Sequence, residues 1–152
     1  MNEASPAPAD GDVPRPDSVH RHRVDFSLVR ARQDPVRLEA DVRYHTRDPH
    51  AITISFCYGR LEWVEWVFAR DLLASGLGAP AGSGDVRIRP SVREPDSVCL
   101  HLISPAGTAH LHGDRYQLTR FLQCTTRLVP FGDEARWLDV DSFLTRVFTG
   151  RR

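Results

Sequence analysis

The stretch EWVEWVFARDLLASGL, residues 62–77, decides the fold prediction because its pattern changes from that of a strand to that of a helix. Alternation in its first half places Trp63 and Glu65 on one face of a strand. Trp66 and Phe68 share the opposite face. Both faces are mainly apolar, which favours a central strand, or a strand with one face that awaits a partner, over a solvent-exposed edge.

The second half of the stretch, ARDLLASGL, predicts a short helix. Asp71 is placed in the first turn, where a carboxylate stabilises the helix dipole. Gly76 is expected to end the helix in the left-handed conformation.

On either side of this stretch, alternating apolar residues predict further strands at 24–28, 36–44, 51–58, 85–90, 97–104 and 107–112. A tight turn at Gly59 and Arg60 is expected to join 51–58 to 61–68 as a hairpin. Asp114 is expected to cap a helix that ends before Pro130, and its predicted apolar stripe is Leu118, Phe121, Leu122, Thr125 and Val129. A final short helix is expected to begin near Asp141.

This order of about seven strands, with one helix in mid-chain and helices at the end, predicts an α+β fold built on antiparallel strands. A chain of 152 residues has the size of one domain. Residues 1–20 hold four prolines among small and polar residues, so they are expected to form a disordered tail. Residues 21–150 are expected to form the single domain.

The charge balance disfavours partners that are recognised by a strong overall field. Twenty acidic residues cancel twenty basic ones, and every basic residue is arginine, which excludes Schiff-base chemistry and a Walker-type lysine loop. Cys57, Cys99 and Cys124 are odd in number and widely spaced, which suits free thiols in a cytoplasmic protein. No apolar run approaches the roughly 18 to 20 residues of a membrane-spanning helix, so no membrane insertion is expected.

The residues that could carry chemistry do not assemble into a known motif. The pairs His20/His22 and His110/His112 lack further ligands at metal-binding spacing, so no metal and no cofactor are predicted. The glycines between 76 and 84 match no phosphate-binding pattern, and no nucleophile has a base beside it, so a catalytic function is disfavoured. The alternative function is single-stranded nucleic-acid binding, through an arginine-rich first third with Arg21, Arg23, Arg30, Arg32, Arg37, Arg43 and Arg47.

Several stretches together resemble the SsgA-like proteins, the sporulation-control proteins of filamentous actinobacteria. They are RYHTRDPHA (43–51), VEWVFARDLL (64–73), GSGDVRIRP (82–90), LISPAGTAHL (102–111), RFLQCTTRLVPFGDE (120–134) and DVDSFL (139–144). The resemblance implies a whirly-like fold with two antiparallel sheets, assembled as a homotrimer. It also implies a cytoplasmic, non-catalytic adaptor that is recruited to the division septum. The implied partners are other SsgA-like proteins and, directly or indirectly, the tubulin-like protein FtsZ and the division or wall-synthesis machinery.

The residues predicted to mediate such contacts are Trp63, Glu65, Trp66, Arg70 and Asp71. We expect Trp63 or Trp66 to pack in a subunit interface, while Arg70 and Asp71 present charges near its rim. The competing interpretation is that Trp63, Trp66 and Phe68 only fill the core and the interface.

Overall fold

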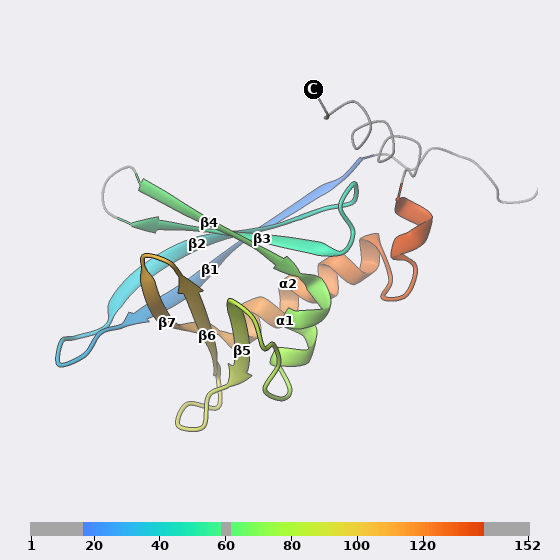
Figure 1. Ribbon diagram of the computed structural model, residues 1–152. Helices are drawn as coiled ribbons and strands as arrows, with labels where there is room; N and C mark the ends of the chain where they lie inside the picture. Colours follow the sequence, from blue (N-terminus) through green and yellow to red (C-terminus); the bar gives the residue numbers. More distant parts are fainter. Residues whose placement is uncertain (1–16, 59–61, 139–152) are drawn as a thin grey trace, which may run out of the picture.

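The computed structural model describes residues 17–58 and 62–138 and contains seven strands (Figure 1). The strands are β1 Val19–Val29, β2 Val36–His45, β3 Ala51–Tyr58, β4 Glu62–Ala69, β5 Val86–Pro90, β6 Ser97–Ser104 and β7 Gly107–Asp114. The helices are α1 Arg70–Gly76, α2 Arg115–Leu128 and the 3-10 turn η1 Glu134–Trp137. The expected strands and the first two helices are confirmed. β1 begins inside the segment assigned to the tail, and the predicted helix near Asp141 lies outside the described residues.

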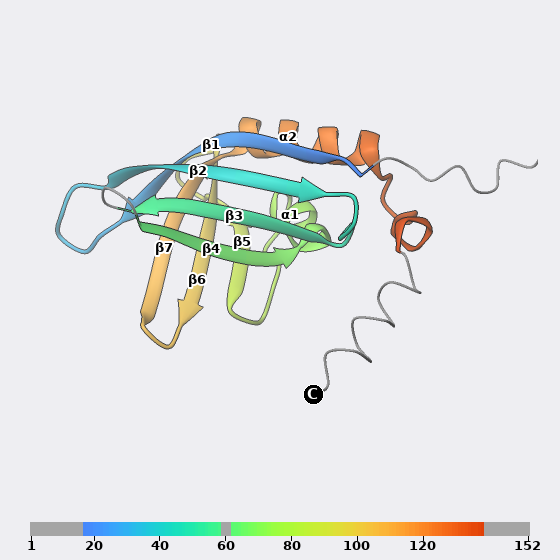
Figure 2. The same cartoon turned by 90° about the horizontal axis from the view of Figure 1, so that it is seen from above.

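All seven strands form one antiparallel sheet in the order β4-β3-β2-β1-β7-β6-β5. The expectation of two separate sheets is therefore corrected: β1 belongs to both halves. It pairs with β2 along nearly its whole length, but with β7 only from Phe26 to Val29. Because this seam is short, the sheet curls, and β1–β4 run across β5–β7 in both views (Figures 1 and 2).

The seam depends on a glycine in β7. Gly113 pairs with Phe26, and a Cβ at this glycine would lie 2.6 Å from the Phe26 ring. The ring uses this space to pack edge-to-face on Phe56, with centroids 5.2 Å apart. A side chain at position 113 would therefore displace the Phe26 ring where β1 pairs with β7, and would disturb the contact of this ring with Phe56.

The core fills the inside of the curl. Alternate residues of the strands face inward, so that Val24, Val42, Tyr44, Ile52 and Ile54 are almost fully buried. Asp114 caps α2 by accepting a hydrogen bond from the Gln117 N–H, as predicted, and the predicted stripe of α2 is buried. α2 packs against β1 and the end of β7, and α1 packs against β5.

The role of Gly76 differs from the prediction. Leu77, which follows α1, stays right-handed with φ −69°, and Gly76 is not among the residues with positive φ. The glycine is required instead by close packing, because a Cβ on it would lie 2.4 Å from Cβ of Ile88 in β5.

A buried arginine connects the end of β4 to the C-terminal elements. Arg70 is 1% exposed, and its Nη1 donates to the carbonyl oxygen of Val129 at 2.6 Å. Its Nη2 donates to Oε1 of Glu134 at 2.7 Å. Arg70 therefore neutralises a buried carboxylate and satisfies a carbonyl at the C-terminal end of α2, where the helix dipole favours a cation.

Aromatic rings enclose the same guanidinium. Its carbon lies 4.1 Å from the centroid of the Phe131 ring and 5.0 Å from that of Tyr44. The hydrogen bond from Arg70 holds the pKa of Glu134 below its ordinary value of 4.5, with further help from the N–H of Gly132. Burial raises the pKa of Tyr44 to about 12, so its hydroxyl stays neutral and donates to the carbonyl oxygen of Pro49.

We expect Gly76→Ala to lower the free energy of unfolding by about 2 kcal/mol, because the added methyl forces α1 away from β5. Gly84→Ala is the matched control, since a Cβ there meets nothing within 4 Å. Its effect should stay within about 0.5 kcal/mol. Urea unfolding of both variants measures the difference, and equal stabilities would contradict the close packing at Gly76.

Arg70→Met should lower the free energy of unfolding by about 3–5 kcal/mol, because it leaves Glu134 buried without its cation. Arg23→Met is the surface control, and about 1 kcal/mol or less is expected there because its ion pair with Glu39 is exposed.

The same pair predicts a dependence of stability on pH. Since the pKa of Glu134 is lower in the folded chain, its contribution is complete above the ordinary value of 4.5 and is lost as the pH falls through the folded pKa. Glu134→Gln cannot titrate, so its stability should fall less steeply below pH 4.5 than that of the parent protein. Parallel slopes in urea unfolding over this range would argue against an ionised Glu134 in the fold.

Candidate interaction surface

The outward side of β4 exposes apolar residues beside charged ones. We call Trp63, Glu65 and Val67 the β4 face. Trp63 is 60% exposed and Val67 is 59% exposed, although both are large apolar side chains. The helices and β5–β7 lie on the other side of β1–β4 (Figures 1 and 2), so these elements leave the β4 face uncovered. Exposed aromatic and aliphatic side chains grouped on one strand are typical of a contact surface.

Charged side chains of β1, β2 and β4 form a series of ion pairs next to these two apolar residues. Arg43 in β2 makes an ion pair with Glu65 at 3.2 Å and another with Asp41 at 3.6 Å. It also donates to the Ser55 hydroxyl at 3.0 Å. Arg21 in β1 also makes an ion pair with Asp41, at 3.9 Å. Such partly exposed pairs contribute little stability each, but they fix Glu65 in place beside Trp63.

The β4 strand is also the free edge of the sheet. This corrects the expectation that disfavoured a solvent-exposed edge: β4 is the last strand in the order, and among the described strands only β3 pairs with it. The opposite edge is partly closed, because Ala81 forms a bridge to Ile88 in β5 with hydrogen bonds of 2.8 and 3.0 Å. An unpaired edge offers backbone N–H and C=O groups to a further strand.

The structure separates the five residues predicted to mediate contacts. Trp63 and Glu65 share the β4 face, whereas Trp66 points to the other side and packs against the core. Arg70 is buried, so the expectation that it presents a charge at an interface rim is corrected, while Asp71 is exposed in the first turn of α1. Trp66 and Arg70 therefore stabilise the fold and do not belong to the β4 face.

Val67 was absent from the predicted contact residues although it is as exposed as Trp63. Alternation along the strand provides the signal, because residues 63, 65 and 67 must share a face. Its exposure follows from the helices and β5–β7 lying on the other side of β1–β4, and this arrangement is not visible in the sequence pattern.

The pairs His20/His22 and His110/His112 do not belong to a metal-binding group in the described part of the chain. Across residues 17–58 and 62–138, no group of three or more His, Cys, Asp or Glu side chains could hold a metal ion. His101 stacks on His110 with centroids 4.2 Å apart, and burial together with nearby positive charge lowers the pKa of His101. No helix within these residues is long and apolar enough to cross a membrane.

The arginines of the first third do not form one uniform basic patch. Arg21, Arg23 and Arg43 pair with acidic residues of β2 or β4, and Arg47 pairs with Asp17. A nucleic-acid surface requires basic side chains that are free to neutralise phosphates. Carboxylates thus engage four of the seven arginines named for the nucleic-acid alternative and weaken its support, while Arg30, Arg32 and Arg37 have no described ion pair.

Comparison with known proteins matches residues 38–134 to the family described as Streptomyces sporulation and cell division protein, SsgA. The chain is 47% identical over 122 residues to the sporulation-specific cell division protein SsgB of Saccharopolyspora erythraea, covering 80% of this chain and 86% of that protein. It is 44% identical over 121 residues to SsgB of Streptomyces coelicolor, covering 79% and 88%.

Solved structures of such proteins share the fold. One, from work that correlates SsgB mutations with longitudinal cell division during sporulation of Streptomyces coelicolor, superposes with a TM-score of 0.77 at 41% identity and covers 80% of this chain and 97% of its own. An SsgA-like sporulation-specific cell division protein from Thermobifida fusca has the same TM-score at 38% identity, with 85% and 95% covered. With both the sequence and the curled sheet in agreement, the chain belongs to the SsgA family of sporulation and cell division proteins.

Proposed function

We propose that this protein is a non-catalytic adaptor of sporulation-specific cell division, which acts by protein–protein contact through the β4 face. The relatives are named for sporulation-specific cell division, which supports this process for the present chain. The observation that carries the mechanism is the exposure of Trp63 and Val67 on the free edge strand. The described residues contain no group of three or more His, Cys, Asp or Glu side chains that could hold a metal ion.

The β4 face has the composition of a recognition surface. A tryptophan is a common anchor of protein interfaces, and the Arg43–Glu65 pair supplies a polar rim beside it. The unpaired β4 edge can add backbone hydrogen bonds to the side-chain contacts. The family resemblance suggests three kinds of occupant: further copies in a homotrimer, another SsgA-like protein, and FtsZ or its associated division machinery at the septum.

The proposal predicts that the double variant Trp63→Ala, Val67→Ala keeps the fold and loses association. Both side chains are more than half exposed, so the thermal midpoint should move by only a few degrees. The loss of a tryptophan anchor should weaken binding about 30-fold or more, which corresponds to at least 2 kcal/mol. Sedimentation velocity and pull-down of candidate division partners measure the loss.

Val92→Ala is the matched control, because Val92 is 89% exposed in the loop between β5 and β6. It should leave both mass and partner binding unchanged. If the double variant behaved like this control in both assays, the β4 face would not be the contact surface.

Live imaging tests the proposed process itself. A fluorescent fusion of the full chain should form ladders or foci at future septa in the sporulating source organism, next to labelled FtsZ. The double variant should remain diffuse at equal expression. A signal that follows the nucleoid instead would overturn the adaptor proposal in favour of nucleic-acid binding.

A further inference from the structure

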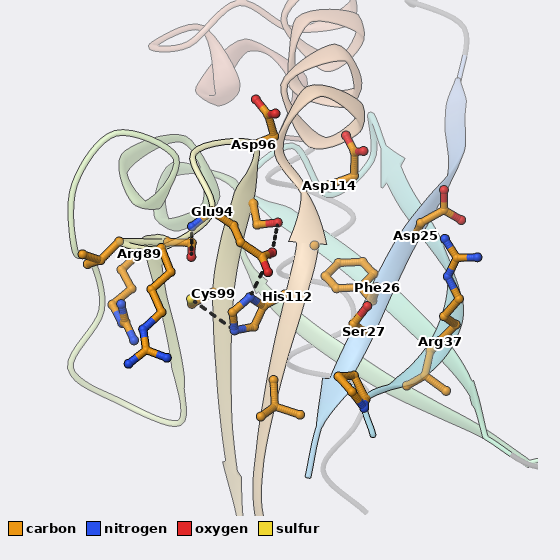
Figure 3. A pocket seen from close by; sticks show the side chains of 18 of the residues that line it. Asp25, Phe26, Ser27, Arg37, Arg89, Glu94, Asp96, Cys99, His112 and Asp114 are labelled. Atoms are coloured by element: carbon orange, nitrogen blue, oxygen red, sulfur yellow. Dashed lines mark hydrogen bonds and ion pairs between the residues drawn. The ribbon is translucent and has the colours of Figure 1, made fainter. Parts of the chain in front are cut away.

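An open groove of about 950 Å³ lies on the outward side of the sheet, where β1 meets β7 and the loop between β5 and β6 (Figure 3). Arg89 of β5, Cys99 of β6 and His112 of β7 form one row across its floor, because Arg89 pairs with Cys99 and Cys99 with His112. Three neighbouring strands therefore fix these side chains next to one another on a rigid support. The volume falls within the range of small-molecule sites, roughly 300–1,000 Å³.

The thiol of Cys99 has a base beside it. Its Sγ lies 3.7 Å from Nε2 of His112, and Nδ1 of the same imidazole lies 3.9 Å from Oε2 of Glu94. This is the order of a nucleophile, a base and an orienting carboxylate. The imidazole can accept the thiol proton on one side while the carboxylate stabilises the resulting imidazolium on the other.

The loop holds Glu94 in this position. The Ser97 hydroxyl donates to Oε2 of Glu94 at 3.1 Å, and the Glu94 N–H donates to the Ser91 hydroxyl at 3.2 Å. The Ser97 N–H also bonds the Glu94 carbonyl at 3.0 Å. Although Glu94 is exposed, its carboxylate is therefore aimed at His112 by the turn that carries it.

Arginine side chains without a described partner line the groove. Arg37, Arg89 and Arg93 line the groove, and within the described part of the chain no hydrogen bond or ion pair holds their guanidinium groups. In Figure 3, Cys99 lies between Arg89 and His112. Arginine recognises carboxylates through paired hydrogen bonds, so these side chains favour a ligand that carries carboxylates.

Carboxylates also line the groove, but most of them have partners. Asp114 accepts from the N–H of Gln117, and Asp25 accepts from the Gln117 side-chain amide. Glu39 pairs with Arg23 at 4.0 Å. Asp96 also lines the groove, and no hydrogen bond or ion pair is described for its carboxylate, so the uncommitted charges are those of three arginines and one carboxylate.

We propose that Cys99 is a nucleophilic thiol that exchanges with low-molecular-weight disulfides bearing carboxylates, with His112 as its base and Glu94 as a positioning residue. His112 takes the thiol proton, and Sγ attacks one sulfur of the disulfide. A bond forms between Cys99 and that sulfur while the original sulfur–sulfur bond breaks. The other half leaves as a thiolate and recovers the proton from His112, so the disulfide itself is the only oxidant.

The chain contains its own reference thiols, because Cys57 and Cys124 are outside any disulfide and half-buried like Cys99. The reduced full-length protein is incubated with oxidised glutathione, quenched with an alkylating reagent and mapped by peptide mass spectrometry. Cys99 should form the mixed disulfide about tenfold faster than either reference thiol. If Cys99 reacted no faster than Cys57 and Cys124, the proposal would be wrong.

Variants of His112 and Glu94 test whether the reactivity of Cys99 depends on these two residues or only on its exposure. His112→Gln should slow Cys99 about tenfold, and Glu94→Gln should slow it less, while Cys57 and Cys124 keep their rates and report that the fold is intact. Unchanged Cys99 rates in both variants would overturn the assignment of His112 and Glu94.

The arginines are tested by the charge of the probe. Arg89→Gln should slow exchange with oxidised glutathione but not with cystamine, which carries amines in place of carboxylates. Arg87→Gln is the matched control, since Arg87 shares the strand face but lies outside the groove lining. Equal losses for both probes, or for both variants, would overturn the preference for carboxylates.

Discussion

The buried guanidinium of Arg70 is the interaction on which the arrangement of the described elements depends. Arg70 lies where β4 turns into α1. Its backbone N–H donates to the His50 carbonyl at 2.7 Å, which connects the end of β4 to the turn before β3. Its side chain reaches the end of α2 and Glu134 of η1. A desolvated charge tolerates few arrangements, because it needs an opposite charge and hydrogen-bond acceptors within reach. One residue therefore fixes where the C-terminal elements close over the sheet.

The short seam between β1 and β7 has the complementary effect of leaving one side of the sheet open. The curl wraps the inward faces of both halves around a single core with the two helices. The outward faces of the same strands then point away from that core, and the described helices cover neither half. The β4 face and the groove beside Cys99 both belong to this outward side. The β4 face lies at one end of the strand order, whereas the groove lies over its middle, where β1 meets β7.

Local patterns in the sequence predicted the positions of the strands and helices well, but not which elements pack against one another. Period-two alternation located the strands, and the spacing of Asp114, Gln117 and Leu118 located α2, because these signals depend on residues close in the chain. The role of Gly76 was mispredicted because its constraint comes from Ile88 in a different strand. Arg70 looked like a surface charge for the same reason, since Glu134 and the α2 carbonyls that bury it lie far along the sequence. The edge position of β4 likewise depends on strand order.

The chemistry of the β4 face favours a regulated contact over permanent burial. A strand meant for a permanent subunit core would show apolar residues throughout, as obligate interfaces do. Here Glu65 sits between Trp63 and Val67 and is held by Arg43, so a charge interrupts the apolar stripe. Charged side chains on an edge strand also hinder indiscriminate strand pairing between copies. Under the proposed function, a partner would have to match the tryptophan, the valine and the ion pair together, and this requirement would give the exposed edge its specificity.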